Sequence, residues 1–271
     1  MSPRTAPRRV AIIGLGAIGR IVLDGIENGP ATVTAVVVRS SHVESAQALV
    51  PNGVSVVTGL DELDAGAVDL LVECAGHEAV TEFAEPALRL GADLMVIATG
   101  ALADDALRAR LSAAAQKSGA RILLPAGAIA GLDGLSALRR GGLDSVRYVA
   151  SKPPDAWIGT PAEETLELGA VNSATTFFTG SAGEAARRYP KNANLAATVA
   201  LAGLGFDETV VELVADPTTA DNVGRIEAEG KLGRLELELR GPPMSENPKT
   251  SVITAFSILE AIERAHRTIV V

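Results

Sequence analysis

The sequence predicts an α/β protein with a doubly wound parallel sheet in its first half and a smaller α+β domain after it. Short apolar segments alternate with helical segments over residues 10–124, which favours parallel strands linked by helices. The pattern changes after residue 131. There Ile226–Gly230 and Arg234–Arg240 alternate apolar and charged residues, which is typical of antiparallel strands with one solvated face. We therefore expect two different sheets.

The 271 residues are enough for two modest domains. We expect the first domain over residues 1–130 and the second over residues 131–244. A C-terminal segment at 245–271 is expected to complete the first domain, because the helix expected at Ser251–Arg264 is amphipathic enough to dock on it.

Each element follows from its apolar spacing and from the turn residues that bound it. In the first domain, strands are expected at Val10–Ile13, Val33–Val38, Val68–Cys74, Leu94–Ala98 and Arg121–Leu124, with a weaker helix-then-strand pattern over Ser45–Val57 and a polar connector at Asp61–Ala65. Helices are expected at Ile18–Ile26, ending near Asn28, and at Glu78–Leu90 and Ala103–Lys117. In the second domain, strands are also expected at Val146–Ser151, Thr175–Gly180 and Thr209–Ala215, and helices at Pro161–Leu168, Gly183–Arg188 and Asn192–Leu204.

A glycine-rich loop after the first expected strand carries the strongest functional signal. Residues 9–20 read R-V-A-I-I-G-L-G-A-I-G-R, so that G-x-G-x-x-G links a strand to a helix. Gly14 allows the tight turn, Gly16 lets the backbone approach a diphosphate, and Gly19 lets the helix pack closely on the strand. This arrangement is typical of a Rossmann domain that binds a dinucleotide. The expected contacts of the diphosphate are Gly14, Gly16, Ala17, Ile18 and Gly19.

The residue that follows the second expected strand bears on the choice of cofactor. Sites that prefer NAD place an Asp or Glu on the ribose hydroxyls about twenty residues beyond the glycine loop. This chain has Arg39 there, followed by Ser40. A guanidinium and a hydroxyl suit a 2′-phosphate, so we expect NADP to be accepted as well as NAD. The plainer alternative is a solvated surface arginine.

Further cofactor contacts are expected at the carboxyl ends of the later strands, because ligands of open α/β sheets lie at that edge. The residues in those positions are Ala75, Gly76 and Thr99.

Composition excludes several other classes of function. The net charge of −9 argues against a nucleic-acid partner or an anionic membrane. Cys74 is the only cysteine, so no intrachain disulfide can form and a reducing compartment is expected. No uncharged apolar stretch approaches the length of a transmembrane helix, and we expect a cytoplasmic protein. No cluster of His, Cys and carboxylate residues has the spacing of metal ligands, so no metal is expected.

Several motifs, in order along nearly the whole chain, resemble the L-aspartate dehydrogenase family. They are I-G-L-G-A-I-G-R at Ile13–Arg20, E-C-A-G at Glu73–Gly76, G-A-L-A-D at Gly100–Asp104, G-A-I-A-G-L-D at Gly127–Asp133, K-P-P-D-A-W-I-G-T-P-A-E at Lys152–Glu163, Y-P-K-N-A-N at Tyr189–Asn194, A-D-P at Ala215–Pro217 and N-P-K-T-S at Asn247–Ser251. The resemblance implies a Rossmann domain, a smaller substrate and dimerisation domain, and a homodimer. It also implies NAD(P)-linked oxidation of aspartate to iminosuccinate, or the reverse reductive amination, in a family whose product can feed pyridine nucleotide biosynthesis.

The resemblance also assigns residues. Ala128 and Asn194 match positions that contact the nicotinamide half of the cofactor, and Lys152 lies in a loop that resembles a wall of the substrate pocket. Further candidates for binding substrate carboxylates are Thr160, Ser181 and Lys191.

One position departs from the family. Its catalytic histidine ends an A-D-P-x-x-x-x-N-x-H segment, and here Gly224 occupies that position. Amine oxidation is helped by a base near neutrality, and glycine supplies none. His77, which follows an expected strand, is the one candidate for a substitute catalytic base.

Two alternatives to a substitute base are compatible with Gly224. The enzyme can use water and act mainly as an imine reductase, or the pocket can admit a larger or N-substituted substrate. Outside the enzymes, the alternative is a catalytically silent nucleotide-binding homologue.

Overall fold

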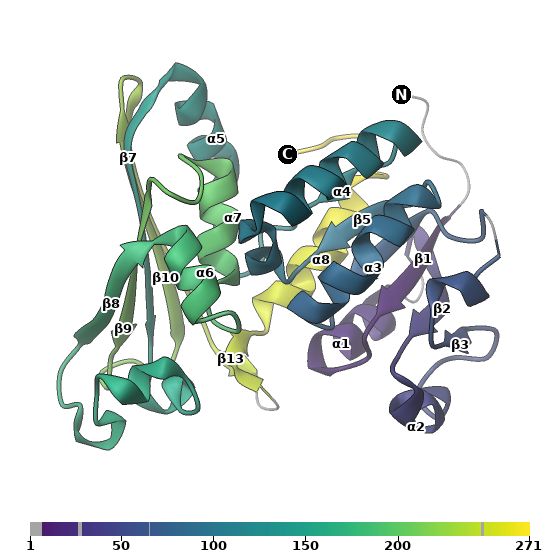
Figure 1. Cartoon of the computed structure of the whole chain (residues 1–271), viewed down its shortest axis with the longest axis horizontal. Coiled ribbons are helices and arrows are strands. Elements are labelled where there is room, and N and C mark those ends of the chain that lie inside the picture. The colour runs from purple at the N-terminus through teal and green to yellow at the C-terminus, as the bar shows by residue number, and fades with distance from the viewer. Residues whose placement is uncertain (1–6, 27–28, 65, 245–246) are drawn as a thin grey trace. The chain divides into compact units, whose positions relative to one another are not determined.

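The computed structural model describes residues 7–26, 29–64, 66–244 and 247–271 (Figure 1). The chain forms two compact units: Met1–Pro125 together with Ala255–Val271, and Ala126–Thr254. The helix end expected near Asn28, residue Ala65 of the expected connector and residues 245–246 of the expected C-terminal segment lie outside the described residues.

The first unit contains a six-stranded parallel sheet with the order β3-β2-β1-β4-β5-β6. The chain runs outward from β1 in both directions, which is the Rossmann order and confirms the predicted doubly wound sheet. The strands are β1 Arg8–Ile13, β2 Ala31–Val37, β3 Ser55–Val57, β4 Leu70–Glu73, β5 Asp93–Val96 and β6 Ile122–Leu123. The helices are α1 Ala17–Ile26, α2 Val43–Gln47, α3 His77–Arg89, α4 Asp105–Ser118 and α8 Ile253–Arg264, with 3-10 turns at Ser40–His42, Leu60–Glu62 and Thr99–Ala103.

Burial on both faces of the sheet explains the continuous apolar runs in the sequence. Every residue of β4 is buried, as expected where helices cover both faces. Val10 of β1, Leu23 of α1 and Ile258 of α8 belong to one hydrophobic core. Gly25 lets α1 approach α8 so closely that a Cβ atom there would clash with Leu259. The C-terminal helix is therefore an integral part of the first unit.

The second unit contains a five-stranded mixed sheet with the order β11-β10-β7-β9-β8. Strands β7 and β9 run parallel and the other neighbouring pairs run antiparallel, so the predicted antiparallel pair near the end of the chain is confirmed as β10 and β11. The strands are β7 Leu143–Lys152, β8 Thr175–Ser181, β9 Thr209–Ala215, β10 Asn222–Gly230 and β11 Gly233–Gly241, with a short pair β12 Pro243–Met244 and β13 Asn247–Ser251. The helices are α5 Leu132–Gly141, α6 Ala182–Arg188 and α7 Asn194–Ala202, with 3-10 turns at Pro154–Trp157, Pro161–Glu164 and Leu168–Ala170.

The α-helix predicted at Pro161–Leu168 is wrong, because the segment forms separate 3-10 turns. Glu163, Glu164 and Thr165 are exposed there, so little apolar surface supports a longer helix. The Glu163 carboxylate instead turns back and accepts a hydrogen bond of 2.9 Å from the backbone N–H of Gly159.

Three predicted helices, α4, α7 and α8, begin two residues later than expected, and one helix was not predicted. Helix α7 begins at Asn194, and α8 begins at Ile253 because Asn247–Ser251 pairs with β12 as a strand. The unpredicted helix is α5, whose leucines are interspersed with glycines that conceal the helical spacing.

None of the helices in the described residues is long and apolar enough to cross a membrane. The same residues also contain no group of three or more His, Cys, Asp or Glu side chains placed to hold a metal ion.

Candidate functional site

The glycine loop between β1 and α1 has the geometry that its sequence predicts. Gly14 has a φ of +90°, and a Cβ atom there would lie 2.7 Å from the Cβ atom of Ala75, in the loop after β4. Glycine is needed at this position both for the left-handed backbone and for the close approach of the second loop. Gly19 lies so near the Gly14 carbonyl oxygen that any side chain would clash with it.

Gly16 differs from the other two glycines of the motif because its surroundings are open, with no atom within 4 Å of an added Cβ atom. The first turn of α1 reads Ala-Ile-Gly-Arg and carries no carboxylate. A diphosphate can therefore approach Gly16 and the positive end of the helix dipole without electrostatic repulsion from that turn. These features fit a dinucleotide cofactor.

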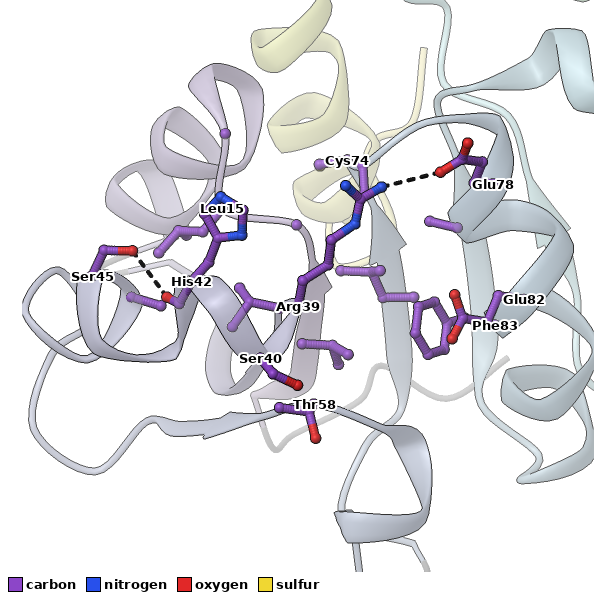
Figure 2. Close-up of a pocket in the computed structure, with 18 of the residues that line it drawn as sticks. Leu15, Arg39, Ser40, His42, Ser45, Thr58, Cys74, Glu78, Glu82 and Phe83 are labelled. Atoms are coloured by element: carbon purple, nitrogen blue, oxygen red, sulfur yellow. Dashed lines mark hydrogen bonds and ion pairs between the residues drawn. The ribbon is translucent and has the colours of Figure 1, made fainter.

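A cavity of about 780 Å³ opens beside the glycine loop (Figure 2). Its walls come from the loop after β1, the end of β2 with the turn and helix α2 that follow it, the loop after β4, and α3. The carboxyl ends of these parallel strands thus meet at one edge of the sheet, as expected for a ligand site in such a fold. The predicted cofactor residues that line the cavity are Gly14, Gly16, Arg39, Ser40 and Ala75.

The other predicted residues of the first unit lie near this edge without lining the cavity. Ala17, Ile18 and Gly19 form the first turn of α1, and Gly76 precedes α3 as its N-cap. Thr99 is buried at the start of the 3-10 turn after β5. His77 is the half-buried first residue of α3, so its assignment as a catalytic base stays a prediction.

Arg39, two residues after the end of β2, reaches across the cavity toward α3 (Figure 2). Its Nη2 atom lies 3.1 Å from Oε2 of Glu78 in an ion pair whose two side chains are 76% and 87% exposed. The sequence did not reveal Glu78, His42, Ser45 or Phe83 as cavity residues, because they face it only once the loops after β2 and β4 are brought together.

Glu73, the last residue of β4, ties together the two loops that follow β4 and β5. It is 1% exposed, and its Oε1 atom accepts hydrogen bonds from the backbone N–H groups of Ala75 at 2.7 Å and Gly76 at 2.6 Å. Its Oε2 atom accepts two more, from Ile97 at 3.1 Å and Ala98 at 2.9 Å. One buried carboxylate therefore fixes the backbone beside the cavity.

Cys74 lines the cavity as a free thiol. Burial, and to a lesser degree the charge of Glu73, raise the pKa of the Cys74 thiol well above its ordinary value. The thiol therefore stays protonated near neutral pH, which is the state of an inert structural cysteine rather than a nucleophile.

In the second unit, Gly224 lies on β10 with its empty side facing two buried side chains. A Cβ atom at Gly224 would lie 3.1 Å from Cδ1 of Ile129 and 3.1 Å from the hydroxyl of Tyr148. Tyr148 is 2% exposed, and burial raises the pKa of its phenol well above the ordinary value of 10. The group nearest to Gly224 that can donate a hydrogen bond is thus a phenol that keeps its proton at neutral pH.

Lys152 ends β7 and is 8% exposed. Its Nζ atom lies 5.4 Å from the ring centre of Trp157, whose indole N–H donates a 3.1 Å hydrogen bond to the Val214 carbonyl oxygen. A cation over the face of a fixed, buried ring is attracted to it, so the ammonium is held in place.

The remaining predicted residues of the second unit have separate positions. The Thr160 hydroxyl caps a 3-10 turn and donates to the Trp157 carbonyl oxygen, and Ser181 caps α6 by accepting a hydrogen bond from the Glu184 N–H. Lys191 is exposed, Ala128 is buried, and Asn194 is the half-buried first residue of α7. Local structure thus accounts for Thr160 and Ser181, and their substrate contacts stay predictions.

Asn192 was not predicted to have a role. It is buried, and its side-chain amide has no hydrogen-bond partner among the described residues. A buried amide in this state is expected to bind a water molecule or a ligand.

The Rossmann sheet and the cavity beside its glycine loop define a dinucleotide-dependent oxidoreductase. Residues 14–125 match the family model described as homoserine dehydrogenase, NAD binding domain, and residues 133–265 match the model described as aspartate dehydrogenase, C-terminal. The chain is 48% identical over 263 residues to the L-aspartate dehydrogenase of Cupriavidus necator, covering 95% of this chain and 97% of that protein. It is 49% identical over 260 residues to the L-aspartate dehydrogenase of Pseudomonas aeruginosa, covering 93% and 96%.

The crystal structure of aspartate dehydrogenase from Thermotoga maritima has the same fold, with a TM-score of 0.74, 28% identity, and coverage of 97% of this chain and 99% of that one. The chain belongs to the L-aspartate dehydrogenase family. The family resemblance predicted from the sequence motifs is therefore confirmed, as is an NAD(P)-binding domain in the first half of the chain.

Proposed function

We propose that this chain catalyses the NAD(P)-dependent interconversion of L-aspartate and iminosuccinate, the imine that forms from oxaloacetate and ammonia. The observation that carries the proposal is 48–49% identity to curated L-aspartate dehydrogenases over nearly the whole chain. The likeness includes the cofactor-binding half and the second unit alike, so the reaction need not be inferred from the Rossmann fold alone.

The first unit supplies a binding site for the adenosine and diphosphate parts of the cofactor. When bound, NAD(P) supplies a ring that accepts a hydride from the amino acid or returns it to the imine. Gly14, Gly16 and the start of α1 would hold the diphosphate, and Arg39 with Ser40 would hold the adenosine ribose. Ala128 and Asn194 are proposed contacts of the nicotinamide half.

In the second unit, Lys152 is the residue that we propose to bind a substrate carboxylate. Its ammonium is held against Trp157, which lowers the entropy lost when a carboxylate pairs with it. Lys191, which is exposed, is a further candidate for the second carboxylate of a dicarboxylic substrate.

The protonation state of the phenol beside Gly224 favours a second candidate function, an imine reductase acting on a different or N-substituted substrate. Oxidation of an ammonium group needs a proton acceptor, and the phenol nearest to Gly224 keeps its proton at neutral pH because burial raises its pKa well above the ordinary value of 10. Such a group can donate a hydrogen bond to an imine or a carboxylate but cannot act as a base at neutral pH. His77 is the proposed base if aspartate is oxidised efficiently.

The two functions can be distinguished by following NADH or NADPH through its absorbance at 340 nm. NADPH or NADH consumption with oxaloacetate and ammonia, and NAD(P)⁺ reduction with L-aspartate, are the results expected of an aspartate dehydrogenase. Faster consumption with methylamine in place of ammonia would identify the N-substituted imine reductase. No turnover with any of these substrates, together with saturable cofactor binding, would point to a catalytically silent homologue.

We also propose, from the family relationship, that the protein is a homodimer in the cytoplasm. Light scattering coupled to gel filtration tests the dimer, because the chain has a mass of 27.8 kDa and a dimer would have about twice that mass.

A further inference from the structure

We propose that Glu78 sets the preference between NAD and NADP, by competing with the 2′-phosphate of NADP for the guanidinium of Arg39. The inference rests on the proposed cofactor site, but it concerns a residue on α3 rather than the end of β2, where this preference is usually sought. It starts from the ion pair that spans the cavity (Figure 2).

Both partners of the ion pair line the cavity, and both are largely exposed. Arg39 is therefore free to exchange one anionic partner for another. A 2′-phosphate carries a charge between −1 and −2 near neutral pH and accepts bidentate hydrogen bonds from a guanidinium. When NADP is bound, Arg39 must leave Glu78 or be shared with it.

The other charged groups of the cavity do not offset the cost of that exchange. His42 and Glu82 also line it, together with the hydroxyls of Ser40, Ser45 and Thr58. Two carboxylates thus stand beside one arginine and one histidine. Once Arg39 turns to the phosphate, Glu78 loses the guanidinium that compensates its charge, and the loss of this ion pair disfavours NADP.

The balance is different for NAD. The 2′-hydroxyl of NAD carries no charge, so Arg39 can keep its ion pair while the ribose binds. The carboxylate of Glu78 can also accept a hydrogen bond from a ribose hydroxyl, the role that an acidic residue after the second strand has in other Rossmann sites. Glu78 therefore favours NAD, because the ion pair with Arg39 is kept and the carboxylate can bind a ribose hydroxyl. It disfavours NADP, because that ion pair must break.

The test is the dissociation constant of NADPH and of NADH, measured by fluorescence titration of the protein at about 50 mM salt, where exposed charges are weakly screened. For Glu78→Gln, NADPH should bind about threefold to tenfold more tightly, the range expected for exposed charges, while NADH binds equally well or more weakly. Glu82→Gln is the matched control, because it removes the same charge from the same helix and cavity wall but has no ion pair with Arg39 among the described residues. It should change the ratio of the two constants by less than twofold.

A double-mutant cycle separates the mechanism from a general effect of charge. In an Arg39→Gln background, Glu78→Gln should lose most of its effect on NADPH, because there is no guanidinium left to release. An unchanged ratio of constants in Glu78→Gln, an equal response to Glu82→Gln, or a full effect in the absence of Arg39 would each overturn the inference. Absence of saturable binding of both cofactors to the unaltered protein would instead overturn the proposed cofactor site itself.

Discussion

The carboxylate of Glu73 accepts a 2.7 Å hydrogen bond from the backbone N–H of Ala75, the residue whose Cβ atom packs directly against Gly14 in the wall of the cavity. The buried end of β4 thus fixes a loop that must lie within contact distance of the glycine loop. Since the same carboxylate also holds the loop after β5, the backbone at this edge of the sheet is preorganised before any cofactor binds.

Replacing Glu73 with Gln should weaken cofactor binding without removing a contact to the cofactor. An amide of the same shape offers one oxygen where the carboxylate offers two, so its NH₂ group would face the backbone donors of one loop. We expect a loss of about 2–4 kcal/mol in the free energy of unfolding and about a tenfold rise in the dissociation constant of NADPH.

Glu62→Gln is the matched control for this prediction. Its carboxylate also accepts backbone hydrogen bonds in a loop, from Thr58 at 2.8 Å and Gly59 at 3.1 Å, but it is exposed, and both bonds go to one oxygen, which the amide of Gln can replace. Urea unfolding and NADPH titration should show only a small change for Glu62→Gln. Equal changes in the two variants would mean that the hydrogen bonds of Glu73 are no more important for cofactor binding than those of Glu62.

Replacing Gly224 with His should introduce a base, but it should also disturb the packing around this position. The new Cβ atom would meet Tyr148 and Ile129 at 3.1 Å, and buried Tyr148 has little room to move, so we expect a loss of stability of about 1–3 kcal/mol. If the pocket lacks only a base, Gly224→His should raise the rate of aspartate oxidation by about 100-fold.

Gly224→Ala isolates the packing effect, because it adds the Cβ atom without the imidazole. Steady-state rates of NAD(P)⁺ reduction should then rise for the histidine variant alone. A rise in both variants, or in neither, would show that the missing imidazole does not limit the reaction.

The fold was largely predictable from local patterns, whereas much of the site was not. Buried parallel strands such as β4 can be recognised from a few consecutive residues, and so can the glycine loop at Gly14. The ion pair of Arg39 with Glu78 joins residues 39 positions apart, and the hydrogen bond from Ala98 to Glu73 spans 25. Such relations depend on which strands lie side by side, and a single sequence does not display that order.

The missed and mistaken elements have the same origin. Helix α5 contains Gly134, which argues against a helix locally, yet Leu135 is fully buried and tertiary packing holds the helix in place. Ser251 was expected to begin the terminal helix, but pairing of β13 with β12 keeps it extended. In both cases contacts with distant residues outweighed the local preference.

Asp93 should make the stability of the first unit fall in acid. The side chain of Arg8, which is 2% exposed, forms an ion pair with Asp93, and Arg121 donates a 2.7 Å hydrogen bond to it. Burial raises the pKa of Asp93, but the hydrogen bonds of Arg121 and the charges of both arginines outweigh burial and hold it below its ordinary value of 3.8. The stabilisation is therefore complete above about pH 4 and is lost as the pH falls through the lowered pKa.

Asp93→Asn should lower the free energy of unfolding by about 3 kcal/mol at pH 7, because it removes the carboxylate that forms an ion pair with buried Arg8. Urea unfolding at pH 7 and pH 3 should show the gap from the unaltered protein narrowing in acid. Asp69→Asn, which breaks the more exposed pair with Arg9, should have a much smaller effect. A gap that stays constant with pH would contradict the lowered pKa.

Tyr148 should have the opposite signature and destabilise the protein in alkali. Because burial raises the pKa of Tyr148 well above its ordinary value of 10, the folded state holds the phenolic proton more tightly than the unfolded state does. The resulting stabilisation is complete below the ordinary pKa of 10 and is lost as the pH rises above 10 toward the raised pKa. At pH 10.5 the loss amounts to about 1 kcal/mol, and Tyr148→Phe should not show it. Urea unfolding of both proteins at pH 8 and pH 10.5 measures the difference, and the raised pKa of Tyr189 cancels because both proteins contain that residue. Equal losses in the two proteins would contradict the raised pKa of the hydroxyl beside Gly224.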